Sequence, residues 1–207
     1  MNERSTVFVV EDDRGTREAI CELVQLMNLG CQGYSSGREF LASCDPDQPG
    51  CAVLAVDVPD LNGLAIQQQL AAREIPLPVI FVTKHNDVSL AVQAMRAGAV
   101  HYLEKPLRTH ELWDAIQEAL QLDQRRRRAQ TIRREIRQRL SLLSAKERQV
   151  LDCVAEGKAN RQIAAELGVS VRAIEVRRSK LMRKLGVKTP LDLIYYGVAA
   201  ADLTAIV

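Results

Sequence analysis

Polar and charged side chains follow four short apolar runs of this chain, at the points where those runs end. Glu11 and Asp12 follow the first run, and Asp57 follows another. Thr83 and Lys105 end two further runs. Because the carboxyl ends of parallel strands line one crevice of an open sheet, we expect these side chains to meet there. Three carboxylates, a hydroxyl and an ammonium group suit a divalent cation together with a phosphoryl group.

The chemistry expected of this set is phosphoryl transfer to an aspartate. Mg²⁺ prefers oxygen ligands and keeps several waters, so Asp12 and Asp57 could bind it directly and Glu11 through water. Asp57 could attack a phosphoryl group in line and form an aspartyl phosphate. The metal and Lys105 would neutralise the phosphoryl oxygens, and Thr83 could donate a hydrogen bond to them. One acid after a strand usually caps a helix, so the prediction depends on the whole set.

Strand-like and helix-like segments alternate as far as residue 120, which predicts the elements that must position these residues. The expected strands are Thr6–Val10, Cys31–Tyr34, Ala52–Val56, Val79–Val82 and Tyr102–Glu104, all buried on both faces. The expected helices are Arg14–Met27, Arg38–Ser43, Leu64–Arg73, Val88–Ala97 and one from Thr109 onward, with Gly30 and Gly98 as helix stops. Five such repeats predict an α/β fold with a doubly wound five-stranded parallel sheet.

The helix that starts at Thr109 has no clear end before residue 140. Neither Gly nor Pro occurs between Glu111 and Leu140. Apolar residues recur there at spacings of three and four, namely Ala129, Ile132, Ile136, Leu140 and Leu143. This stripe predicts a long linker helix, which is either solvated or paired with its copy in a dimer.

Residues 144–201 predict four further helices. Ser144 and Glu147 form a capping box, and Asn160 is the expected cap of the second helix. The turn 168–170 leads into the helix Val171–Leu185, and Thr189-Pro190 begins the last helix. Two short helices joined by a Gly-containing turn form a helix-turn-helix, whose second helix enters the major groove of DNA.

Composition supports a nucleic-acid partner and argues against a membrane protein. Residues 1–120 carry 9 Lys and Arg against 17 Asp and Glu, whereas residues 121–207 carry 19 against 9. A basic half of this kind indicates a polyanionic partner. No apolar run reaches the roughly 18 residues that span a membrane. Five cysteines without C-x-x-C spacing indicate neither a disulfide framework nor a zinc site, so we expect a cytoplasmic protein.

The first half resembles the receiver domain of bacterial response regulators. The stretches that carry the resemblance are VFVVEDD at 7–13, VLAVDVPDLNG at 53–63, VIFVT at 79–83 and AGAVHYLEKP at 97–106. The resemblance implies a flavodoxin-like receiver over 1–122. It also implies that Asp57 is the phosphoacceptor, Glu11 and Asp12 the acidic pair, and Lys105 the phosphate-binding lysine. Thr83 and Tyr102 would be the switch pair, with Tyr102 turning inward on phosphorylation.

Two features of this sequence differ from the usual receiver pattern. Gly63 follows only six residues after Asp57, so the loop is shorter than is usual in the family. The family takes one metal ligand from the backbone carbonyl two residues after the acceptor, and Pro59 holds that position here. Lys84 follows Thr83, where the family usually has a small residue.

The stretch Leu143–Leu193 is similar to LuxR-type DNA-binding domains. This resemblance implies an all-α four-helix domain over 141–207, preceded by a linker helix over 123–140. With the receiver, the chain resembles NarL/FixJ-family response regulators. The resemblance implies that Arg172, Glu175, Val176, Arg178 and Lys180 face duplex DNA. Glu175 stands where Lys is common. The implied partners are a sensor histidine kinase and a second copy of the chain on DNA, with RNA polymerase as a further candidate.

Three functions therefore compete. The first is a transcription regulator controlled by phosphorylation of Asp57 with Mg²⁺ as cofactor. The second keeps DNA binding without phosphorylation, because of the short loop, and the receiver then serves dimerisation or partner binding. The third is an aspartate-nucleophile phosphatase, but such enzymes typically have a second Asp two residues after the nucleophile. Pro59 holds that position here.

Overall fold

A computed structural model describes residues 5–84 and 87–204, and the side chains as far as residue 200. By internal contacts the chain divides into two compact units, Met1–Arg127 and Arg128–Val207. Within the described residues, no helix is both long and apolar enough to cross a membrane.

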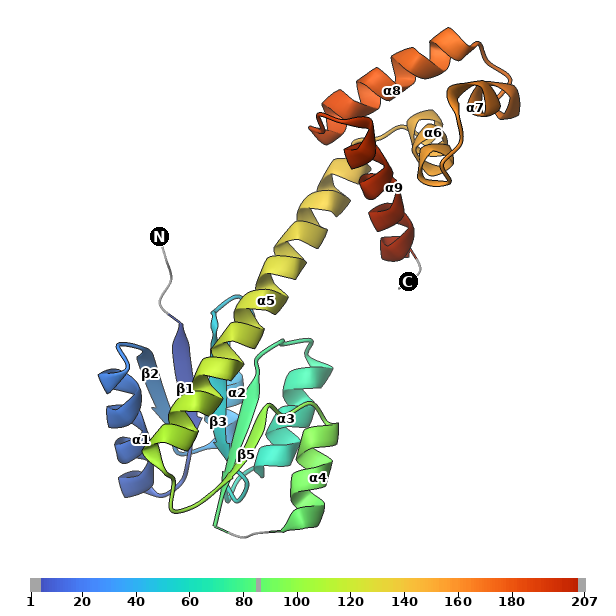
Figure 1. The fold of residues 1–207 in the computed structure, drawn as a ribbon. Coiled ribbons are helices and arrows are strands. Elements are labelled where there is room, and N and C mark those ends of the chain that lie inside the picture. Colours follow the sequence, from blue (N-terminus) through green and yellow to red (C-terminus); the bar gives the residue numbers. More distant parts are fainter. Residues whose placement is uncertain (1–4, 85–86, 205–207) are drawn as a thin grey trace. The chain divides into compact units, whose positions relative to one another are not determined.

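The first unit is a five-stranded parallel sheet with helices on both faces, and α5 lies in front of the sheet and α2 behind it in Figure 1. This confirms the predicted doubly wound α/β fold. The strand order is β2-β1-β3-β4-β5. The strands are β1 (Thr6–Val10), β2 (Gly30–Tyr34), β3 (Gly50–Ala55), β4 (Val79–Thr83) and β5 (His101–Glu104). The helices of this part are α1 (Arg14–Leu26), α2 (Gly37–Ser43), α3 (Gly63–Ala72), α4 (Val88–Arg96) and the first part of α5 (Thr109–Ser141), whose later residues belong to the second unit.

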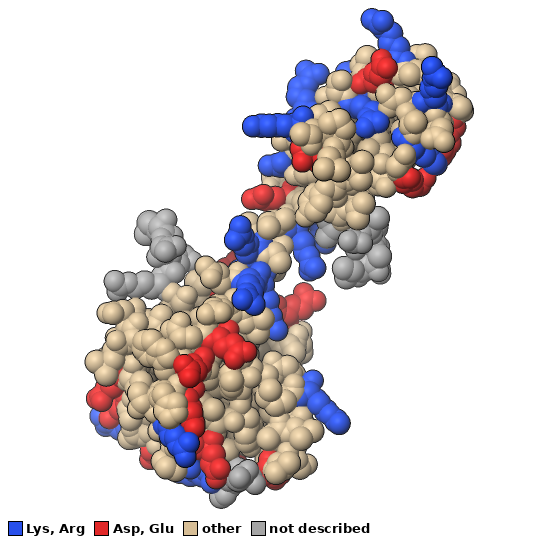
Figure 2. Space-filling view, viewed as in Figure 1, with Lys and Arg blue, Asp and Glu red and all other residues tan. Residues whose placement is uncertain are grey.

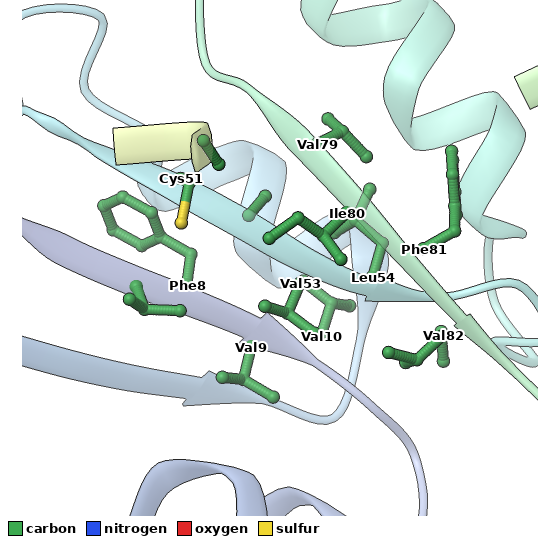
Figure 3. Close-up of a cluster of buried hydrophobic side chains, with 14 of the residues drawn as sticks. Phe8, Val9, Val10, Cys51, Val53, Leu54, Val79, Ile80, Phe81 and Val82 are labelled. Carbon is green, nitrogen blue, oxygen red and sulfur yellow. The ribbon is translucent and has the colours of Figure 1, made fainter. Parts of the chain in front are cut away.

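The core of the sheet is made by its three central strands. Every residue of β1, β3 and β4 is buried, and Figure 3 shows hydrophobic side chains of these strands gathered in one cluster. The prediction of burial on both faces was wrong for β2 and β5, which form the two edges and are only partly buried. An edge strand has a neighbour on one side only, so its sequence need not be a continuous apolar run.

Gly30 was wrongly predicted to stop α1. The helix ends at Leu26 with Met27 as its cap, and Asn28 adopts the left-handed conformation at φ 58°. Asparagine tolerates this conformation better than most residues with a Cβ atom. Gly30 is instead the first residue of β2. Gly98 does follow the cap of α4 with φ 91°, as predicted.

The second unit contains α6 (Ala145–Ala155), α7 (Asn160–Glu166), α8 (Val171–Leu185) and α9 (Pro190–Thr204). The Ser144–Glu147 capping box is present, as predicted. The prediction that Asn160 caps α7 was wrong, because Ala159 is the cap. The backbone N–H of Ala159 donates a hydrogen bond to Gln162 Oε1 at 2.8 Å. The Asn160 amide oxygen instead accepts a hydrogen bond from Arg178 in α8.

The two ends of the predicted linker, residues 123–140, pack within the compact units themselves. Asp123 is buried, and its carboxylate accepts hydrogen bonds from Gly50 N at 3.0 Å and from Arg127. Ile136 and Leu140 are buried in the core of the second unit. Ile132 is 43% exposed, so the predicted coiled-coil stripe presents only its first part to solvent.

We predict that Gly50→Ala destabilises the first unit by about 3 kcal/mol, the upper end of the usual overpacking cost. A Cβ atom at Gly50 would lie 1.9 Å from the backbone oxygen of Thr6, which cannot rotate away. Urea unfolding followed by the fluorescence of Trp113, the single tryptophan, measures this. Gly15→Ala is the control: its Cβ has room, and it should stabilise α1 by about 0.5–1 kcal/mol. Equal midpoints for the two variants would contradict the prediction.

Candidate functional site: an acidic crevice and a helix-turn-helix

A buried ion pair lies at the carboxyl ends of the strands, where the sequence predicts a crevice. Glu11 follows β1 and is 1% exposed, and its Oε2 lies 2.5 Å from Nζ of Lys105, which follows β5. The backbone N–H of Lys105 donates to Thr83 O at 2.7 Å, which holds the lysine beside the end of β4. The predicted meeting of Glu11, Lys105 and the end of β4 is therefore present. A buried carboxylate needs such a partner, since an unpaired buried charge is costly.

The loop after β1 is held by α1. Asp13 caps this helix by accepting hydrogen bonds from Thr16 N at 2.8 Å and Thr16 Oγ1 at 2.6 Å. The Thr16 hydroxyl is the main cause that lowers the pKa of the Asp13 carboxyl. Arg17 Nη1 donates to the backbone oxygens of Glu11 and Asp12 at 2.6 and 3.1 Å. The Asp12 side chain is exposed.

The short loop after Asp57 is fixed at several points. Asp57 is exposed, but Val58 is only 5% exposed. Asp60 accepts hydrogen bonds from Ser36 Oγ at 2.8 Å and from the backbone N–H groups of Gly37 and Arg38 at 3.0 Å each. Asn62 caps α3, and Gly63 N donates to Val56 O at 2.9 Å. These contacts fix most of the loop between Asp57 and Gly63.

The described carboxylates do not form a ready metal site. No group of three or more His, Cys, Asp or Glu side chains in the described part of the chain is placed to hold a metal ion. Glu11 is engaged by Lys105, and Asp12 and Asp57 supply the exposed carboxylates. The ligand set of Glu11, Asp12, Asp57 and the Pro59 carbonyl stays a prediction. Its buried member, Glu11, is paired with Lys105 here.

The predicted switch residues lie on neighbouring strands. Thr83 ends β4 and is 3% exposed, and Lys84 beside it is exposed. The ring of Tyr102 lies 6.2 Å from that of Phe81, centroid to centroid. Its hydroxyl is already buried, without a hydrogen-bond partner among the described residues. The expected inward turn of Tyr102 on phosphorylation would therefore start from a hydroxyl that is buried here.

The helix-turn-helix presents α8 with one apolar face and one basic face. Ile174, Leu181 and Leu185 are fully buried, while Arg172, Glu175 and Lys180 are exposed and Val176 is 51% exposed. Arg178 is half-buried because its Nη1 donates to Asn160 Oδ1 in α7 at 2.8 Å. Blue side chains project from this unit in Figure 2, as the basic composition predicts.

An ion pair fixes the end of α8 to the start of α6. Lys184 Nζ lies 2.7 Å from Glu147 Oε2, the same carboxylate that completes the capping box. The hydrogen bond from Lys184 is the largest cause that lowers the pKa of Glu147 to about 2.

Comparison with known proteins agrees with both halves. The model of the response regulator receiver domain matches residues 7–117, and that of the bacterial regulatory proteins of the luxR family matches residues 141–196. The chain belongs to the response regulators that join a receiver domain to a LuxR-type DNA-binding domain.

Named relatives span nearly the whole chain. Nodulation protein W of Bradyrhizobium diazoefficiens is 39% identical over 191 residues, which cover 92% of this chain and 84% of that protein. The transcriptional regulatory protein FixJ of Azorhizobium caulinodans is 36% identical and covers 98% of both chains. A solved structure of the response regulator StyR is 36% identical with a TM-score of 0.85, covering 93% of this chain and 98% of that one.

These relatives establish the class of protein. The chain is a DNA-binding transcriptional response regulator of the NarL/FixJ type and not an enzyme, so the phosphatase hypothesis is set aside. Receiver domains generally bind Mg²⁺ at their phosphorylation site and receive a phosphoryl group from a histidine kinase.

Three positioning residues were missed by sequence reasoning, namely Arg17, Asp60 and the Asn160 partner of Arg178. Asp60 contacts residues 22 to 24 positions earlier, and Asn160 lies 18 positions before Arg178. No local pattern marks such distant pairs. Arg17 was detectable in principle, because it lies four residues after the Asp13 cap and so on the same helix face.

We predict that Asp60→Asn destabilises the first unit by about 1 kcal/mol near neutral pH, the usual effect of losing a helix cap. Hydrogen bonds, first that from Arg38 N, lower the pKa of Asp60 to about 2 from its usual 3.8. Because the folded pKa is the lower one, the stabilisation is complete above about pH 4 and is lost as the pH falls toward 2.

Urea midpoints from Trp113 fluorescence at pH 7, 4 and 2.5 test this. The difference between wild type and Asp60→Asn should shrink as the pH falls. Asp47→Asn removes an exposed carboxylate before β3 and is the matched control, with no expected effect. A pH-independent difference would show that the charge of Asp60 is not the cause.

Proposed function

We propose that the regulator reads duplex DNA with the exposed face of α8. The observation that carries this is the division of α8 into a fully buried apolar face and an open basic face. Residues near the N-terminus of a recognition helix contact base edges, and Lys and Arg along it contact phosphates. We assign base contacts to Arg172, Glu175 and Val176, and phosphate contacts to Arg178 and Lys180.

We expect two side chains of this face to determine which DNA sequences it prefers. The hydrogen bond that Arg178 Nη1 donates to Asn160 Oδ1 fixes one nitrogen of the guanidinium, so the remaining N–H groups are oriented before DNA arrives. Glu175 is exposed on the same helix and would accept a hydrogen bond from the N4 amino group of cytosine. A carboxylate repels the phosphates of DNA. Glu175 would therefore favour the docking position in which it meets cytosine and disfavour positions that are shifted along the DNA.

We further propose that two copies bind together on DNA. Leu191, Tyr195 and Val198 of α9 recur at spacings of four and three, and they are 74%, 62% and 47% exposed. Such a stripe suits a second copy of itself. The Ile132–Leu143 stripe is a poorer interface, because Ile136 and Leu140 are buried in their own unit. The two half-sites would lie roughly one helical turn of DNA apart. RNA polymerase is a further proposed partner, and the proposed location of the regulator is the cytoplasm.

We predict that replacing Arg178 and Lys180 together by Ala weakens operator binding and flattens its salt dependence. Each lost phosphate contact lowers the slope of log affinity against log salt by about one, so the slope should fall by about two per copy. Mobility-shift titrations of the full chain at several salt concentrations measure this. Arg38→Ala, which removes an exposed charge of α2, is the control and should leave the slope unchanged. An unchanged slope in the double variant would contradict the assignment.

We propose Asp57 as the phosphoacceptor, served by a partner histidine kinase. Its carboxylate is exposed at the end of β3, between the strands that end in Glu11 and Thr83. A phosphoryl group there would add close to two negative charges. We propose that the Lys105 ammonium group neutralises those charges. To do so, it would have to give up part of its contact with Glu11. Thr83 would donate its hydroxyl to the phosphoryl oxygens.

We predict that wild type incubated with acetyl phosphate and Mg²⁺ gains one phosphoryl group, about 80 Da, and that Asp57→Asn gains none. Intact-mass measurement detects the adduct. Asp47→Asn is a second control, because it removes an exposed carboxylate but leaves the proposed acceptor and the loop that follows it unchanged. Parallel samples with a chelator in place of Mg²⁺ show whether the metal is needed. No adduct on wild type would support the alternative regulator that works without phosphorylation.

A further inference from the structure

Two thiols of the receiver lie against each other at an edge of the sheet. Cys21 in α1 and Cys31 in the edge strand β2 are both free thiols, and both are half-buried. The Cys31 thiol donates to Cys21 Sγ at 2.7 Å. A disulfide has an S–S distance of about 2.05 Å, so a small side-chain movement separates this pair from a covalent bond.

The surroundings of the pair favour this contact. Cys31 and Gly33 are two residues apart in β2 and so point to the same face of the sheet. A Cβ atom at Gly33 would lie 3.4 Å from Cys21 Sγ, so the glycine leaves room for the sulfur of α1. Because β2 is an edge strand, a small oxidant can approach from its open side.

The other cysteines are not competing partners of Cys31. Cys31 and Cys51 both pair with Val7 of β1, from opposite sides. Two strand spacings therefore separate their backbones, about 9.5 Å, which exceeds the roughly 7 Å that a disulfide can bridge. Cys51 is also fully buried. Cys44 follows α2, and Cys153 belongs to the second unit.

We propose that Cys21 and Cys31 form a reversible disulfide, which gives the receiver a second, thiol-based input. The oxidant class is a low-molecular-weight disulfide such as oxidised glutathione. In a reducing compartment, a disulfide of this kind is usually transient and redox-sensing. Burial is the first cause that raises the pKa of the Cys31 thiol, so its thiolate forms rarely and the exchange is slow.

The exchange proceeds in two balanced steps. One cysteine thiolate attacks oxidised glutathione, forms a mixed disulfide and releases one glutathione thiolate, which takes up the proton that the cysteine lost. The second cysteine then attacks the protein sulfur of the mixed disulfide, forms the Cys21–Cys31 bond and releases the second glutathione. Two cysteine sulfurs are oxidised and two glutathione sulfurs are reduced.

The bond would tie α1 to β2 next to the acidic crevice. Arg17, one turn before Cys21, holds the backbone oxygens of Glu11 and Asp12. Tyr34, at the end of the same strand as Cys31, accepts a hydrogen bond from Glu11 N at 3.0 Å. The crosslink would therefore restrict the two elements that position the loop Glu11–Asp13.

Equilibration of the full chain in glutathione buffers of increasing oxidised fraction tests the proposal. After acid quenching, denaturation and alkylation with N-ethylmaleimide, the labelled cysteines of wild type should fall from five to three. Peptide mapping should recover Cys21 linked to Cys31. Cys44→Ser, which removes another half-buried thiol, should form the same link, whereas Cys21→Ser and Cys31→Ser should not.

The oxidised wild type should also unfold at a temperature roughly 5–10 °C higher, by Trp113 fluorescence, since a disulfide restricts the unfolded chain. Five labelled cysteines at every redox poise, or a link between another pair, would overturn the proposal. An unchanged or lower unfolding temperature would overturn the claim that the bond fixes α1 on β2. Wild type and Cys44→Ser decide the matter even if the serine variants fold poorly.

Discussion

The ion pair between Glu11 and Lys105 is the interaction on which the crevice depends. In the strand order β1-β3-β4-β5, these residues follow strands that are not neighbours, so the lysine reaches over the ends of β4 and β3. Removing one member of a buried pair typically costs about 3–5 kcal/mol, because the other charge is left without a partner. Any anion that enters the crevice must therefore share or replace the contact that Lys105 already has. An incoming phosphoryl group would compete with Glu11, and this competition links chemistry at Asp57 to the loop that follows β1.

The predictable part of the fold is the part that local sequence patterns determine. The continuous apolar runs of β1, β3 and β4 marked the central strands and hence the position of each residue that follows them. The capping box at Ser144 and the left-handed Gly186 at the end of α8 likewise depend on neighbouring residues alone. The sequence GCQGY of β2 shows no such run, because an edge strand is only half covered. Contacts between distant segments were not predictable, as Asp60 with Ser36 illustrates.

Both ends of the predicted linker, residues 123–140, make contacts within the unit that each end adjoins. Asp123 and Arg127 belong to the receiver, since Arg127 donates to the backbone oxygens of Pro46, Asp47 and Gln48. At the other end, Arg139 donates to Leu185 O and Tyr196 Oη within the DNA-binding unit, beside the buried Ile136 and Leu140. Helical periodicity continues through all of these residues, so the sequence pattern alone could not show where one unit stops. Polar anchors made by single arginines, and not a change of periodicity, define the ends of the linker.

One face of α1 connects the features of the receiver that bear on regulation. Asp13, Arg17 and Cys21 follow one another at intervals of four residues and so lie along one side of the helix. The first caps the helix, the second holds the acidic loop, and the third contacts Cys31. A displacement of α1 would therefore act on the crevice through Arg17 without any change in the sheet, whose central strands are fully buried and close-packed. The fixed loop after Asp57 has little freedom to respond, so α1 and the Lys105 contact are the parts of this crevice best able to adjust.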